Sequence, residues 1–165
     1  MDTAALITRG TVWLALLCYG AMVILQLRDS AHAEIRARRI WTLGCILFLA
    51  HVAAAFHFYH DWSHAVAAED TWRQTLNQVG VNFGGGIYFN YVFAAVWLGD
   101  CIVWWLRGEN FRARNPKWSV VLHLFFVFMI FNSTVIFGRG MAKPTGAVLC
   151  FALLFCQWRS HHRRE

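Results

Sequence analysis

Apolar residues run in five long stretches along the chain, separated by shorter polar or charged segments. Each stretch holds roughly 17–23 residues, the length that a helix rising about 1.5 Å per residue needs to cross a hydrocarbon core of ~30 Å. The pattern predicts an all-α, polytopic membrane protein whose transmembrane helices form one bundle. The predicted spans are about 11–27, 40–58, 84–106, 118–137 and 142–158.

The longest polar segment between these spans is 59–83. From Phe58 to Val79 it contains neither Pro nor Gly, and it includes the good helix formers Ala, Glu and Gln. We therefore expect the second helix to continue beyond the membrane, or to bend into a separate surface helix. The glycines at 84–86 then end this element and begin the third span.

Basic residues concentrate in alternate connecting segments, which predicts the direction of the spans. Segment 28–39 has four Arg and segment 107–117 has three Arg and one Lys, whereas 59–83 has Arg73 alone. Because Lys and Arg favour the cytoplasmic side, the N-terminus and 59–83 are predicted outside and the C-terminus inside. A four-span arrangement would place the basic tail RSHHRRE outside, so we include the shorter fifth span.

Composition agrees with one integral membrane domain over residues 1–165. Charged residues make up 15% of the chain, against about 25% in soluble domains. The net charge of +6 comes from basic residues at the span ends, so we predict no nucleic-acid binding. The expected location is a bacterial-type inner membrane. The expected partners are the lipid bilayer, other membrane proteins or a second copy of the chain.

Histidines gather in the stretch HFYHDWSH at the outer end of the second span. At 100° per residue, His57, His60 and His64 fall within about 60° of one helix face, and an i, i+4 pair of imidazoles can share a metal ion. Imidazole and carboxylate ligands favour Zn, Cu or Fe. The candidate ligands are His57, His60, Asp61, His64, Glu69 and Asp70.

Two alternatives to a metal site stay open for this cluster. His, Trp and Tyr are common at membrane interfaces because their rings are apolar and their edges polar, and exposed imidazoles also sense pH or transfer protons. Haem fits less well, because bis-His ligation needs two histidines at similar depth. His51 and His123 differ in predicted depth by roughly 8 Å.

Polar residues inside the spans sort into two layers by depth. Asp100 and His123 lie about 8 Å from the cytoplasmic face on neighbouring antiparallel spans, so we expect a hydrogen bond between them. It would fix helix register or form one step of a proton relay. The outer layer contains His51, His57, Asn90 and Asn132, with the rest of the histidine cluster just above it.

These patterns give three hypotheses for function. The first is a small membrane protein with a transition-metal site at its outer face, whose role is redox, transport or structural. The second is a non-catalytic subunit or assembly factor of a larger membrane complex, and the third is a proton or ion pathway. The chain lacks an HExxH motif, a Walker loop and a GxSxG elbow, so no enzyme reaction is predicted.

Overall fold

The structure, a computed structural model, describes residues 2–28, 30–108 and 116–162, with the backbone alone for 116 and 157–162. In these residues it is helical and contains no strand, which confirms the all-α prediction. The elements are α1 (Thr3–Gln26), α2 (Ala31–Tyr59), α3 (His64–Val79), α4 (Gly86–Arg107), α5 (Pro116–Phe131), the π-helical segment η2 (Asn132–Ile136) and α6 (Ala142–His162).

Short polar side chains mark where the first three helices begin. Asp2, Ser30 and Ser63 are the N-cap residues of α1, α2 and α3, and each side chain accepts a hydrogen bond from a backbone N–H of the first turn. Such caps satisfy donors that lack a partner within the helix. Gly80 ends α3 in the left-handed conformation, with a φ of 74°, which is typical of a helix C-terminus.

Four helical segments are long and apolar enough to cross a membrane, which indicates a lipid environment. They are α1, α2, α4 and the combined segment Lys117–Ile136. In α6 the apolar part, Ala142–Cys156, is shorter. Four of the five predicted spans therefore have matching helices, and the crossing of the membrane by α6 stays a prediction. The first helix begins at Thr3, eight residues before the predicted span, because Asp2 caps it there.

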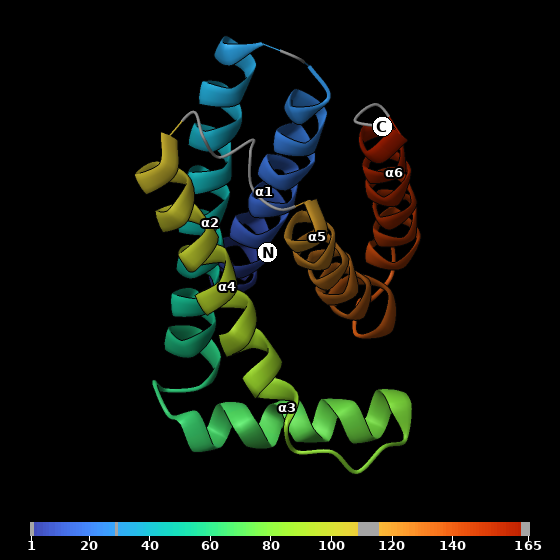
Figure 1. Cartoon of the computed structure of the whole chain (residues 1–165). Helices are drawn as coiled ribbons and strands as arrows, with labels where there is room; N and C mark the ends of the chain where they lie inside the picture. Colours follow the sequence, from blue (N-terminus) through green and yellow to red (C-terminus); the bar gives the residue numbers. More distant parts are fainter. Residues whose placement is uncertain (1, 29, 109–115, 163–165) are drawn as a thin grey trace.

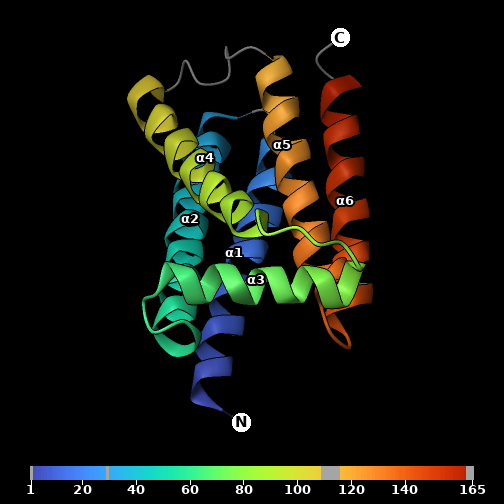
Figure 2. The same cartoon turned by 90° about the horizontal axis from the view of Figure 1, so that it is seen from below.

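The helices form a bundle with two distinct ends. Figure 2 shows the turn between α1 and α2, the end of α4 and the C-terminal end of α6 at one end. We call it the arginine end, because Arg28, Arg36, Arg38, Arg39 and Arg107 lie there. The opposite end carries the N-terminus and α3, and we call it the α3 end. Helix α3 lies crosswise to the other helices in both views (Figures 1 and 2).

The first two helices share the most extensive helix–helix contact in the described part of the chain. Gly44 allows part of this approach, because a Cβ atom there would lie 3.0 Å from Cβ of Cys18 and 3.0 Å from the ring of Trp97. The centre of the bundle is aromatic. Its largest fully buried side chains are Tyr19, Met22, Trp41, Trp97 and Phe126.

Candidate functional site

The histidine cluster does not lie on one helix. Helix α2 ends at Tyr59, His60 is its C-cap, and His64 is the first residue of α3. Between them Asp61 and Trp62 have φ values of 45° and 57°, a left-handed conformation that turns the chain through a corner. The prediction that the three histidines share one helix face is therefore wrong, and the alternative of a separate surface helix is correct.

At this corner the histidines have different neighbours. Nδ1 of His60 lies 3.2 Å from Oδ2 of Asp70, within ion-pair distance but outside hydrogen-bond geometry. Nδ1 of His64 lies 2.8 Å from the hydroxyl of Tyr91. The ring of His57 instead packs against neighbouring aromatic rings.

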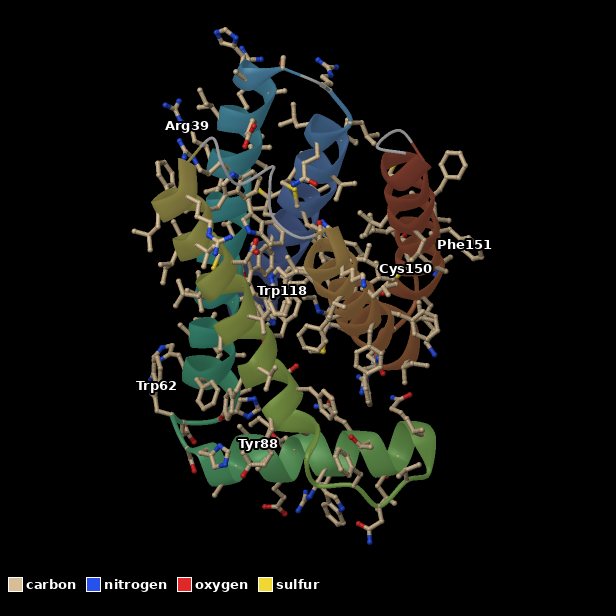
Figure 3. The ribbon with its side chains drawn as sticks, in the orientation of Figure 1. Arg39, Trp62, Tyr88, Trp118, Cys150 and Phe151 are labelled. Carbon is tan, nitrogen blue, oxygen red and sulfur yellow. The ribbon has the colours of Figure 1, made fainter. Side chains whose placement is uncertain are left out.

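The remaining candidate ligands at the corner are exposed. Glu69 accepts a hydrogen bond from Arg73 one turn later in α3, at 2.6 Å, and Asp61 faces solvent. Trp62, 64% exposed, projects outward from the corner (Figure 3). Across residues 2–28, 30–108 and 117–156, no three His, Cys, Asp or Glu side chains are arranged to hold a metal ion. The transition-metal site and haem stay predictions without support from this geometry.

The polar residues predicted beneath the corner are also dispersed. Nδ1 of His51 lies 2.8 Å from the backbone oxygen of Thr8 in α1. Asn132, the first residue of η2, donates from Nδ2 to the backbone oxygen of Phe128 in α5 at 2.8 Å, and Asn90 is exposed. The outer layer is thus not a pocket around the histidines. His51 instead contacts a backbone oxygen of α1, and Asn132 bonds to one of α5.

The inner layer is the best-formed polar site among the described residues. Nε1 of Trp41 donates to Oδ2 of Asp100 at 3.0 Å, and the Tyr19 hydroxyl lies 2.9 Å from Nδ1 of His123. These four residues, from α1, α2, α4 and α5, are the inner cluster. The Tyr19 ring joins its two halves, since it stacks on His123 at 5.8 Å and packs against Trp41 at 5.7 Å between ring centroids.

Water is largely excluded from the inner cluster. Asp100 is 8% exposed and His123 is 3% exposed, while Tyr19 and Trp41 are buried still more completely. The rings of Trp97 and Phe126 pack against Trp41 at 4.9 Å and 5.0 Å between centroids. A carboxyl group and an imidazole therefore lie in an apolar, aromatic environment, where hydrogen bonds are strong and unpartnered charge is costly.

The hydrogen bonds of the inner cluster differ in their chemistry. The indole N–H of Trp41 can only donate, so its bond to Asp100 is strongest when the carboxyl group is ionised. The hydroxyl of Tyr19 can donate to an unprotonated Nδ1 of His123 or accept from a protonated one. This second bond therefore persists in either protonation state of the imidazole.

The sequence predicted Asp100 and His123 but missed Tyr19 and Trp41. Both lie in apolar stretches, where an aromatic ring is usually a packing residue or part of an interface belt. The only signal available was that a hydroxyl or indole N–H needs a partner when it is buried. The direct hydrogen bond between Asp100 and His123 stays a prediction. The described bonds show their connection through Tyr19 and Trp41.

Comparison of the chain with known protein families, with curated proteins and with solved structures found no match.

Proposed function

We propose that this multi-pass membrane protein takes up and releases a proton at a centre formed by Asp100 and His123. The observation that carries the proposal is the burial of both ionisable side chains between helices that can cross a membrane. A charge near the middle of a transmembrane helix costs roughly 2.5–3.5 kcal/mol on insertion scales, and buried ionisable groups in membranes commonly act in proton relays.

The protonation states of this pair support the proposal. A carboxylate with an imidazolium has no net charge, and neither has a protonated carboxyl group with a neutral imidazole. Trp41 and Tyr19 offer hydrogen bonds in both arrangements. Within this pair one proton therefore leaves no net charge, and the apolar environment makes the number of protons bound here sensitive to the surroundings of the two side chains.

The proposed proton exchange is with the arginine end of the bundle. Asp100 precedes Arg107 by seven residues, which is about 10 Å along α4. Towards the α3 end the next layer is aromatic, and there Phe93 packs on Phe126 at 4.5 Å between centroids. We accordingly propose a proton-binding centre rather than a continuous channel. We place the protein in a bacterial-type cell membrane, with the arginine end in the cytoplasm.

Infrared difference spectroscopy of the protein in lipid vesicles tests this function. We expect a band of a protonated carboxyl group that changes with pH and disappears in Asp100→Asn. An amide oxygen still accepts from Trp41 but cannot titrate, so this variant separates proton binding from hydrogen bonding. The matched control is His51→Asn, which changes a half-buried membrane histidine outside the inner cluster and should leave the band unchanged.

A pH-dependent spectrum that is identical in wild type and Asp100→Asn would overturn the proposal. The four polar side chains would then fix helix register, as expected for a non-catalytic subunit of a larger membrane complex.

A further inference from the structure

We infer that α3 is an interfacial helix that lies in the headgroup region of the bilayer at the α3 end of the bundle. Three independent features carry this inference: the depth at which α3 lies, the distribution of its side chains, and the way it is attached to α4. It is independent of the proton centre and concerns a lipid surface rather than a protein partner.

The flanking helices fix the depth of α3. After the arginine-rich first turns of α2, the apolar part runs from Ile40 to Tyr59, about 20 residues or ~30 Å. This equals the thickness of the hydrocarbon core, so Tyr59 lies close to its outer boundary. Helix α3 begins a few residues later and runs crosswise to the bundle (Figure 1). It therefore lies along the boundary instead of extending into water.

One side of α3 carries an apolar stripe at helical spacing. Its positions lie three or four residues apart and fall within about 80° around the helix axis. They are Ala65, Ala68, Trp72, Leu76 and Val79. Leu76 and Val79 are exposed to solvent, and Val81 and Phe83 extend the exposed apolar surface beyond the helix. A stripe with these residues is typical of helices that lie in the plane of a membrane.

The charged residues of α3 range from the border of the stripe to the opposite side: Glu69 lies directly beside it, Arg73 about 60° beyond its edge and Asp70 about 120° beyond. Glu69 and Arg73 form an exposed ion pair, which needs water. Within the stripe, the indole of Trp72 donates from Nε1 to Oδ1 of Asn82 at 2.7 Å. An apolar ring with its polar edge hydrogen-bonded is the arrangement that tryptophan adopts at membrane interfaces.

A third face of α3 holds the helix against the bundle. Ala67 is buried there, and Thr71 approaches Gly86 so closely that a Cβ atom at this glycine would lie 2.8 Å from the threonine methyl group. His64 reaches Tyr91 of α4, and Figure 3 shows Tyr88 of the same helix beside α3. Because α4 packs on this face, the apolar stripe is not covered by α4 and can contact lipid.

Spin-label accessibility tests the inference on the full chain in phosphatidylcholine vesicles. Labels are attached through a ketone amino acid, because the five native cysteines would react with thiol reagents. They are placed singly at Leu76 and Val79 in the stripe, and at Gln74 and Asn77 as matched controls on the opposite, polar side. All four side chains are exposed, so the labels should not disturb folding.

We expect the ratio of oxygen to nickel-chelate accessibility to be several-fold higher at the two stripe positions than at the two control positions. Equal access of the nickel chelate to all four positions would overturn the inference, because α3 would then lie in water. Protection of the stripe from both reagents would overturn it as well, because a second copy or another protein would then cover this face.

Discussion

The inner cluster and the corner between α2 and α3 both contain hydrogen-bonded histidines, but they are built in opposite ways. The partners in the inner cluster are 104 and 59 residues apart in sequence, and all four side chains are buried. At the corner His60 and Asp70 lie on adjacent elements, and His64 and Tyr91 are 27 residues apart and exposed.

This difference shows which of the two sites depends on the whole fold. The corner needs only α2, α3 and the start of α4, and water competes for each of its polar contacts. The inner cluster needs four helices in register. If one of its hydrogen bonds is lost, the buried polar groups cannot form a replacement bond with water. Substitutions should therefore have large effects in the inner cluster and small effects at the corner.

Matched tryptophan substitutions should give the largest contrast. Trp41→Ala leaves a cavity and removes the donor to Asp100, so we expect a loss of about 3–5 kcal/mol in the free energy of unfolding. Trp62→Ala at the corner should cost less than about 0.5 kcal/mol, because its side chain is mostly exposed. Unfolding in mixed detergent micelles measures both. Similar losses at the two positions would remove the distinction between the sites.

Double-mutant cycles should give the next largest difference. We expect Asp100→Asn and His123→Ala to couple by about 1 kcal/mol, a typical size for polar pairs in membranes, because Tyr19 and Trp41 connect them. The matched cycle at the corner, His64→Ala with Tyr91→Phe, should show only a few tenths of that value. Strict additivity in the inner cycle would mean that the two halves of the cluster act independently.

A smaller effect is expected for the contact between His60 and Asp70 at the corner, which is an ion pair only when the imidazole is protonated. Asp70→Asn should lower the free energy of unfolding by about 0.5 kcal/mol, because Asp70 is partly exposed and salt screens the pair. The loss should shrink at high ionic strength. Glu69→Gln is the control, since its pair with Arg73 is more exposed. A loss of several kcal/mol, unaffected by salt, would show that this pair holds the corner in place.

The smallest effect should come from removing metal ions. Since the corner separates the histidines, we expect a chelator to change the free energy of unfolding by less than about 0.5 kcal/mol in protein from metal-replete cells. Metal content by mass spectrometry, before and after chelation, accompanies the measurement. A stoichiometric metal ion that His60→Ala and His64→Ala both remove would restore the metal site predicted from the sequence.

The fold was largely predictable because the length of an apolar stretch and the residues that cap a helix are local features of the sequence. The apolar stretches of about 20 residues predicted the membrane helices, but α3 ends at Gly80, before the glycines at 84–86 that were predicted to end it. The break after Tyr59 was harder to predict. It depends on left-handed backbone at Asp61 and Trp62, and neither position has the glycine that usually signals such a turn.

The candidate site was predictable in depth but not in its lateral contacts. Counting residues from the basic segments placed Asp100 and His123 at the same level, and the structure connects them through other side chains. Which residues of α1 and α2 face them depends on the rotation of each helix about its axis. That rotation is set by the packing of Tyr19 and Trp41 in the aromatic centre, and no local pattern in the sequence reports it.

The division of the inner cluster between helices has a consequence for biogenesis. Helices α1 and α2 are joined by a short turn and pack closely, so they can enter the bilayer together as a helical hairpin that already carries Tyr19 and Trp41. Asp100 and His123 follow on α4 and α5, and they reach those hydroxyl and indole groups only when the later helices associate with this hairpin. The penalty for a carboxyl group in lipid thus acts against partly assembled chains and favours completion of the bundle.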